Sequence, residues 1–482
     1  MSDEATPPPP TEGEAAREQQ PTSPSRRKFV RDAGFLVAGL AIGAAAGGSG
    51  AYLLGSNSIK LPPGLKQGTG QFTIGTSVST SGPTAGVISQ EVQAFDALVT
   101  LINNRGGVYA ADMGGYIPIR MIVLQDGGPP DTATLKSNYT TLCTSDAVDM
   151  CIGPFTAAPS ETASPIAIAN GVPYIDAQAD EIPIFNQPGA KDWVFGSLNI
   201  INYWMWNYLN LIKATDPSAA IALIDEGDDF DVESAGTGPS KFGAYQMCQQ
   251  LGLNVVLQDT GVNSGFSATF DYSTEVQKVK AAGTDIVIYF DLTAALAAVF
   301  LEAIHNEFKS SGWKPKAYHT TNGAQVAFTG TAGALATGYT ADVYWDNSFP
   351  YEGLWGKNTW AQVQTMANFT DLNWPWISIG YSCVEDCVQA VQTAGSTNKT
   401  AVANALKTME FTNLIGPWRA QNPLKDPFPP PSGATTGINM SLSRAIPVQL
   451  INVNGTLQRK LLYPADIATG TYQYPEPLFP NG

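Results

Sequence analysis

The segment Asp285-Ile286-Val287-Ile288-Tyr289-Phe290 carries five apolar residues in succession, and a helical pattern follows it from Thr293 to Glu307. A short continuous apolar run of this kind is typical of a strand that is buried on both faces of a parallel sheet. The same alternation recurs along the chain. Further runs that predict strands lie at Phe72–Gly75, Ile117–Leu124, Val148–Ile152, Val172–Ile175, Ala219–Ile224 and Leu253–Leu257. Helical patterns lie between them, at Ile88–Asn103, Thr132–Cys143, Ser160–Ala169, Ile201–Leu211, Lys241–Leu251 and Ser273–Ala282.

This strand–helix pattern runs twice, over about residues 71–195 and again over about 196–340. The two sets are too large for one sheet of usual size, so the sequence predicts an α/β protein with two doubly wound parallel sheets. After them, helices are expected at Trp376–Ala394 and Ala401–Thr408, and one more strand at Ile446–Val453.

The composition excludes several function classes. The 482 residues include 42 acidic and 26 basic residues, a formal charge of −16, which disfavours binding to nucleic acid. There are two histidines, His305 and His319, so the usual parts of hydrolase triads and zinc sites are scarce. The sequence contains no GxxxxGK[ST] phosphate loop, GxSxG elbow, CxxC pair or HExxH motif. We therefore expect no enzyme activity, cofactor or metal site.

The N-terminal segment predicts export. Residues 1–24 are polar and proline-rich, Arg26 and Arg27 precede Phe29, and an uncharged stretch runs from Ala33 to Leu54. A basic region followed by an apolar region is typical of an export signal, and the paired arginines resemble a twin-arginine signal. We assign residues 1–56 to a disordered terminus plus this signal, and 57–70 to a linker. The mature chain is expected in the periplasm or at the cell surface. Whether the signal is cleaved, or residues 33–54 stay as a membrane tether, remains open.

Five cysteines are present, and an exported chain can form disulfides. Cys143 and Cys151 are placed at a helix end and in the following strand, close enough to pair, and form the disulfide candidate. Cys383 and Cys387 lie four apart on one helix face and are expected to be two buried thiols.

The loops that follow the strands are the expected binding region, because ligands of open α/β sheets lie beyond the carboxyl ends of the strands. These loops are rich in small and hydroxyl residues and open helices, which suits capture of a small polar or anionic group by Ser/Thr and backbone N–H groups. They are Ser77–Pro83, Gly153–Ser160, Asp176–Glu181, Asp225–Phe230, Asp291–Thr293 and Thr320–Asn322.

Several motifs in and around these loops match one family in order and spacing. They are Thr80-Ser81-Gly82-Pro83, the turn Ile102-Asn103-Asn104-Arg105-Gly106-Gly107, Asp126, Ile152-Gly153-Pro154, Gly171-Val172-Pro173-Tyr174-Ile175, Gly380-Tyr381 and Leu414-Ile415-Gly416-Pro417. Over residues 71–460 the chain resembles the branched-chain amino acid binding proteins of ABC importers.

This resemblance implies a type I periplasmic-binding-protein fold, in which two lobes joined by three hinge crossovers close on a ligand. Lobe 1 would comprise residues 71–195 and 346–445, and lobe 2 residues 196–345 and 446–482. The crossovers would fall near 195–200, 341–346 and 443–448. The implied function is that of a monomeric, non-enzymatic receptor that captures a small polar solute, an amino acid or amide, and presents it to an ABC permease.

The resemblance also implies ligand-contacting residues. In lobe 1 these are Ser81, Thr156, Ala157, Ala158, Gln178 and Asp180, and in lobe 2 they are Phe230, Asp291 and Asn322. Two departures from the family pattern stand out. Ala157 and Ala158 offer only backbone N–H groups where hydroxyls are common, and Asn322 replaces a carboxylate whose role Asp291 could take.

Two aromatic clusters are interpreted as structural. The helical spacing of Tyr203, Trp204, Trp206 and Tyr208 favours packing over a ligand platform, and Trp374-Pro375-Trp376 is expected to cap the long helix.

A sensory receptor module of the same fold, which signals to a membrane partner, remains open as a second function. A hydrolase is disfavoured because two dispersed histidines do not provide a nucleophile–base pair.

Overall fold

The computed structural model describes residues 51–55, 58–79, 81, 85–127, 131–178, 181–368, 373–420 and 445–479. Arg26, Arg27 and Asp180, which were predicted to belong to the export signal and the ligand site, lie outside these residues. Two sheets organise the described part of the chain, as the repeated strand–helix pattern predicts.

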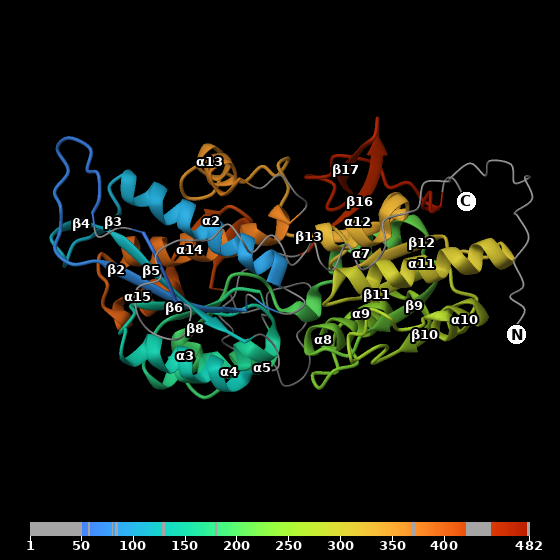
Figure 1. The fold of residues 1–482 in the computed structure, drawn as a ribbon. Helices are drawn as coiled ribbons and strands as arrows, with labels where there is room; N and C mark the ends of the chain where they lie inside the picture. Colours follow the sequence, from blue (N-terminus) through green and yellow to red (C-terminus); the bar gives the residue numbers. More distant parts are fainter. Residues whose placement is uncertain are drawn as a thin grey trace, which may run out of the picture. The chain divides into compact units, whose positions relative to one another are not determined.

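The first sheet has six strands in the order β1-β5-β2-β6-β7-β8. They are β1 (Ala51–Leu54), β2 (Phe72–Ser79), β5 (Ile119–Asp126), β6 (Met150–Ile152), β7 (Tyr174–Asp176) and β8 (Val194–Gly196). All pair in parallel except β1, which is antiparallel to β5. Helices α2 (Ala85–Asn104) and α14 (Trp374–Ala394) cover one face, and α3 (Thr132–Thr144) and α4 (Ala157–Ala169) cover the other (Figure 1). Burial on both faces explains why β6 and the middle of β5 are continuous apolar runs.

Smaller elements complete this lobe. They are the hairpin β3 (Val108–Ala110) and β4 (Gly115–Ile117), α5 (Ile182–Phe185), α6 (Ala190–Trp193), α13 (Lys357–Ala367), α15 (Lys399–Thr408) and the hairpin β14 (Glu410–Asn413) and β15 (Gly416–Arg419). α15 packs on α14 and α6, which joins the late helices to the first sheet.

The second sheet has seven strands in the order β10-β9-β11-β12-β13-β16-β17. They are β9 (Ala220–Asp225), β10 (Asn254–Asp259), β11 (Ile286–Phe290), β12 (Ala317–Thr320), β13 (Thr340–Val343), β16 (Ile446–Val453) and β17 (Thr456–Leu461). β9 to β13 pair in parallel, whereas β16 is antiparallel to both β13 and β17.

Helices α7 (Trp206–Thr215), α8 (Asp229–Ala235), α9 (Ala244–Leu251), α10 (Ser273–Ala281), α11 (Ala294–Ser311) and α12 (Val326–Ala332) pack around this sheet, with 3₁₀ turns at η2 (Ile201–Tyr203) and η3 (Gly333–Leu335). The predicted continuous helix over Ile201–Leu211 is wrong in one respect. It begins as η2, and α7 starts only at Trp206.

The turn after α2 has a clear physical basis. The buried Asn103 side chain donates to the Ile119 carbonyl at 2.8 Å and accepts from the Ile119 N–H at 2.8 Å, which fixes the helix end to β5. Gly107 has φ +75°, and a Cβ there would lie 2.1 Å from the Ile117 carbonyl oxygen. An asparagine and a glycine are therefore required at these two places.

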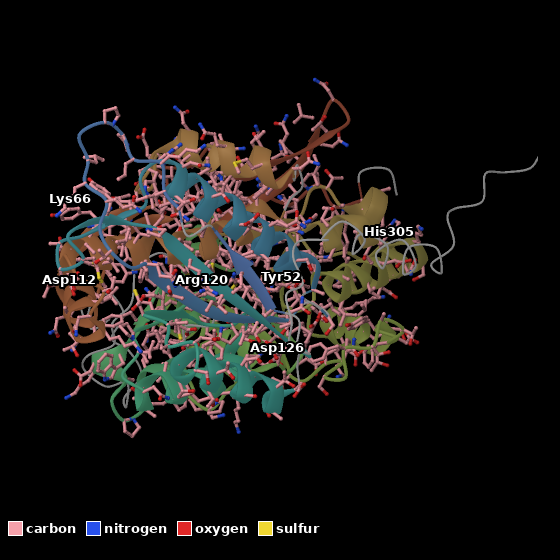
Figure 2. All side chains as sticks on the ribbon, turned by 60° about the vertical axis from the view of Figure 1, so that its left-hand side comes forward. Tyr52, Lys66, Asp112, Arg120, Asp126 and His305 are labelled. Carbon is pink, nitrogen blue, oxygen red and sulfur yellow. The ribbon has the colours of Figure 1, made fainter. Side chains whose placement is uncertain are left out.

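The strand β1 was not predicted. Ala51–Leu54 were assigned to the end of the uncharged export segment, but they form an edge strand that pairs with β5 from Leu124 to Met121. Figure 2 shows Tyr52 beside the strand that carries Arg120 and Asp126, and the Tyr52 hydroxyl is hydrogen-bonded to Gln125. These four residues satisfy the backbone groups of an otherwise open sheet edge, and the assignment of residues 1–56 to an export segment stays a prediction. In the described part of the chain, no helix is both long and apolar enough to cross a membrane.

A chain that begins at residue 57 should be less stable than one that begins at Gly47, by about 2 kcal/mol. The loss comes from the Leu54 side chain, which is 3% exposed, and from the uncovered edge of β5. Urea unfolding of the two shortened chains measures the difference. Equal midpoints would show that β1 does not stabilise the sheet.

The predicted Cys143–Cys151 disulfide is not present. The two residues do come together, with their sulfur atoms 3.9 Å apart, but both are free, buried thiols. An S–S bond is about 2.05 Å long, so this distance is that of two packed side chains between α3 and β6. Cys383 and Cys387 are also free and buried, as expected.

Candidate functional site

A small cavity of about 20 Å³ is lined by residues from both lobes. It lies beyond the carboxyl ends of strands in each sheet, where an open α/β sheet binds ligands. Its lining consists of Phe155, Thr156, Gln178, Leu198, Trp204, Phe230, Leu292, Asn322, Trp376 and Ile379.

Thr156 follows β6 and is the residue before the first turn of α4. Its backbone has φ 74° and ψ 162°, a region that only glycine adopts without strain, and its side chain makes no capping hydrogen bond to the helix. A β-branched residue that is held in this conformation stores strain of about 1–3 kcal/mol, and such strain concentrates at binding sites. The backbone of Thr156 therefore marks the loop after β6 as a functional one.

Gln178 follows β7 and is 9% exposed. Its amide nitrogen donates to Glu91 of α2 at 3.0 Å, while its Oε1 has no hydrogen-bond partner among the residues that the structure describes. Burial raises the pKa of Glu91 to about 8. The contact with Glu91 fixes the orientation of the amide, whose oxygen is itself buried.

The wall from lobe 2 is built around Asp291. This carboxyl is fully buried, and its Oδ1 accepts from the Thr321 hydroxyl at 2.8 Å and the Asn322 N–H at 3.1 Å. Burial raises the pKa of Asp291 to about 7. The Asn322 side chain donates to the Asp291 carbonyl and accepts from Gln325 at 3.0 Å. Asp291 thus positions Asn322 from behind the wall and does not itself line the cavity.

Aromatic rings form much of the remaining lining. Trp204 lies between η2 and α7, and Trp376 lies in the first turn of α14; their rings stack at 5.7 Å with an interplanar angle of 7°. Phe230 of α8 meets Trp204 edge-on at 4.7 Å. The Trp204 indole N–H donates to Asp342 at 2.9 Å, and His319 Nε2 contacts the same carboxylate oxygen at 3.1 Å. Trp204 is therefore held rigidly by a buried polar group of lobe 2.

The structure brings together four of the predicted site residues, Thr156, Gln178, Phe230 and Asn322, around this cavity. The others lie elsewhere. Asp291 is behind the wall, Ala157 is buried in α4, Ala158 is exposed, and Ser81 is exposed with its hydroxyl donating to the Gly127 carbonyl at 2.9 Å.

Sequence reasoning missed six of the lining residues: Phe155, Leu198, Trp204, Leu292, Trp376 and Ile379. Phe155 and Leu292 adjoin Thr156 and Asp291, so their place in the predicted loops was a usable signal. Trp204 and Trp376 were expected to serve in packing and helix capping; they do pack, and they also form the cavity wall. In the part of the chain that the structure describes, no group of three or more His, Cys, Asp or Glu side chains is placed to hold a metal ion.

Comparison with known proteins agrees with this architecture. The profile of the periplasmic binding proteins matches residues 71–424. Among solved structures, the branched-chain amino acid transporter substrate binding protein LivJ from Streptococcus pneumoniae, in complex with isoleucine, is 17% identical with a TM-score of 0.59, and the match covers 82% of this chain and 100% of that one.

Two further structures show the same fold. An ABC transporter solute binding protein from R. palustris, in complex with 4-hydroxybenzoate, is 14% identical with a TM-score of 0.60 over 84% of this chain and 98% of that one. A periplasmic binding protein type 1 from Bordetella pertussis is 15% identical with a TM-score of 0.63 over 82% and 100%. The chain belongs to the periplasmic binding protein family and has its type I fold.

Proposed function

We propose that this protein is the extracytoplasmic solute-binding subunit of an ABC importer and that it binds a small solute without chemical conversion. The observation that carries this proposal is the cavity itself, because the ends of strands from two sheets and two stacked indole rings enclose it. Hinge closure of the lobes would bury the solute between Thr156 and Gln178 on one side and Phe230 and Asn322 on the other. The solved relatives bind solutes as different as isoleucine and 4-hydroxybenzoate, and an amino acid or amide is the leading class here.

The working protein is then exported and monomeric, with a permease as its membrane partner. The family and the basic–apolar N-terminal segment support export. A thermal-shift screen with amino acids, amides, hydroxybenzoates, polyamines and sugars tests the proposal. One solute class should raise the Tm and be recovered unchanged. Turnover of the solute, or no stabilisation by any class, would contradict solute capture.

Thr156→Val should weaken binding of the solute found in that screen by about tenfold, because a hydroxyl that contacts the solute is lost. The Tm of the empty protein should stay nearly constant, since this hydroxyl makes no capping hydrogen bond. Thr162→Val, on the exposed face of the same helix α4, is the matched control. Isothermal titration calorimetry measures both variants. An unchanged Kd for Thr156→Val would exclude the hydroxyl from the site.

A further inference from the structure

A buried chain of hydrogen bonds runs from the cavity wall to the segment that follows β17. The Trp204 indole N–H donates to Asp342 Oδ2 at 2.9 Å, and His319 Nε2 lies 3.1 Å from the same oxygen. On the other side of the imidazole, Nδ1 lies 3.1 Å from the Thr340 hydroxyl, which lies 2.8 Å from Glu476 Oε1. None of these five residues is more than 4% exposed, so the chain is enclosed by protein.

Two neighbouring strands bring these side chains together. Thr340 and Asp342 are two residues apart on β13 and therefore face the same side of the sheet, and His319 of β12 pairs in register with Thr340. The imidazole can then contact both of them. Carboxylate, imidazole and hydroxyl follow one another here as in a hydrolase triad, but His319 and Thr340 are both 0% exposed, so this chain is shielded from any substrate.

The link through the Thr340 hydroxyl needs a proton from one of its neighbours. A hydroxyl carries one proton and can accept others, so Thr340 donates in one of its two short contacts and accepts in the other. The Tyr318 carbonyl is farther away, at 3.4 Å. If Thr340 donates to Glu476, then His319 Nδ1 is protonated; if it donates to Nδ1, then Glu476 is protonated. One proton of His319 or Glu476 therefore belongs to this link.

The link between His319 and Asp342 needs a second proton. Asp342 Oδ2 accepts from Trp204, and it can bond His319 Nε2 only if one of these two atoms is protonated. Glu476, His319 and Asp342 together hold two protons, whichever atoms carry them. Free side chains of these three types hold about one at neutral pH, on the imidazole. Folding thus adds a proton to this chain.

The groups that surround the chain do not take up this proton near neutral pH. Tyr208 of α7 stacks on His319 with ring centroids 3.6 Å apart, and the Tyr472 hydroxyl donates to Glu476 at 3.0 Å. Among the described residues, the other titratable side chains that face the chain are tyrosines whose pKa burial raises: Tyr208, Tyr318, Tyr472 and Tyr474. The charged groups beyond them act on these tyrosines: Asp291 on Tyr318, and Asp216, which pairs with Lys316 at 3.2 Å, on Tyr474.

We propose that Glu476, His319 and Asp342 share two protons and that these protons position Trp204 in the wall of the solute cavity. They are positioning residues, because none of the three lines the cavity. Loss of one proton would leave two acceptor atoms facing each other about 3 Å apart in one link, and the chain would break there. The inference rests on the proposed solute-binding function and adds a dependence on pH to it.

The direction of the pKa shifts supports this proposal. Burial raises the pKa of Glu476 to about 8, while hydrogen bonds from Tyr318, Thr340 and Tyr472 lower it. Burial also raises the pKa of Asp342, while His319 and Trp204 lower it. A chain with these properties keeps the extra proton at neutral pH and releases it in alkaline solution. The Trp204 indole would then lose the fixed acceptor that supports its stack on Trp376 of lobe 1.

NMR of the empty full-length protein tests the proton count, because the chain contains only two histidines. With ¹⁵N-labelled histidine, His319 should show no transition near the usual imidazole pKa of about 6.5 and one transition near pH 8. His305, whose pKa is lowered, is the internal reference and should titrate below pH 6.5. With ¹⁵N-labelled tryptophan, the indole signal of Trp204, assigned by its loss in Trp204→Phe, should move in the same alkaline transition.

Two variants locate this transition in the chain. Thr340→Val removes the hydroxyl link at nearly constant volume, and Glu476→Gln replaces the carboxyl by an amide that cannot release a proton. In both variants the Trp204 signal should no longer move near pH 8. Thr284→Val, at another buried threonine of lobe 2, is the matched control and should keep the transition. Thr340→Val leaves all three titratable groups in place, so it decides the test even if Glu476→Gln does not fold.

Solute affinity provides the functional readout. Isoleucine and 4-hydroxybenzoate, which two of the solved relatives bind, are the probes. The Kd of a bound probe should rise by about tenfold from pH 7 to 9 in the unmodified protein and in Thr284→Val, and less in Thr340→Val. The titration of the probe itself is common to all three proteins, so their difference reports on the chain.

The outcomes are distinguishable. A His319 signal that titrates near pH 6.5 or shows no transition up to pH 10 would overturn the proposal, as would a Trp204 signal that does not follow it. A transition of Trp204 that persists in Thr340→Val would also overturn it. Failure of both probes and of the wider screen would instead contradict solute capture, while the NMR signals of the empty protein still decide the proton count.

Discussion

Raising the pH from 5 to 8 should lower the stability of the empty protein by at least about 3 kcal/mol, and its Tm by about 3 °C or more. The cause is an unusual number of buried carboxyls whose pKa burial raises. The pKa is raised to about 8 for Glu91, Asp386 and Glu476, to about 7 for Asp176 and Asp291, and to about 6 for Asp149 and Asp228.

The direction follows from proton uptake. Between pH 4.5 and 8 the folded protein holds protons on these carboxyls that the unfolded chain has already released, so the free energy of unfolding falls as the pH rises. Their stabilising contribution is complete below about pH 4 and is lost as the pH passes each folded-state pKa. Groups with a lowered pKa, such as Glu307 at about 2, act only below this range. The lowered pKa of His305 opposes the trend on the acid side.

Urea unfolding at several pH values measures this dependence. Glu476→Gln and Asp386→Asn should each flatten the dependence of stability on pH, because each removes a buried carboxyl with a raised pKa. Glu476 accepts from the Tyr318 N–H at 2.7 Å, and Asp386 accepts from the Ser197 hydroxyl at 3.0 Å. Asp271→Asn, at an exposed carboxyl, should leave the slope unchanged. Stability that is constant or increases from pH 5 to 8 would show that these buried carboxyls are ionised and compensated in the folded state.

Much of the fold could be predicted because it depends on local patterns. Strands buried on both faces are often continuous apolar runs, and the run at Ile286–Phe290 forms the buried strand β11 as predicted. The short strands β12 and β13 and the hairpin β14–β15 carry too few residues for such a signal. β1 was missed for another reason. Its four residues continue an uncharged stretch, and only the partner strand β5 determines that they pair in a sheet.

The site was predicted where it follows from topology and missed where it depends on long-range contact. Loops after parallel strands must meet at one edge of a sheet, which led to Thr156, Gln178 and Asn322. The helical spacing of Trp204 gave only a packing signal, since its stack with Trp376 joins segments that are distant in sequence. The exposure of Ala158 and the position of Asp291 behind Asn322 likewise depend on side-chain directions that a motif does not contain.

Replacing Trp204 should have the largest effect on binding of any single change in this site. Trp204→Ala should weaken binding of the preferred solute by about 100-fold and lower the free energy of unfolding by about 3–5 kcal/mol. The indole ring is 4% exposed and contacts Phe230, Tyr344 and Trp376. Its N–H also donates to Asp342, whose Oδ1 has no partner in the described part of the chain, so truncation leaves this buried carboxyl with His319 as its one partner there.

Trp204→Phe separates the two roles of this residue. Phenylalanine keeps an aromatic face for the solute but cannot donate to Asp342, so stability should fall while most of the affinity is retained. Trp313→Phe, at a partly buried tryptophan that packs at the end of α11, is the control and should not alter the Kd. Calorimetry and urea unfolding of the three variants measure both quantities. If Trp204→Ala folds and binds with unchanged affinity, Trp204 serves only in packing and the cavity between the lobes is not the solute site.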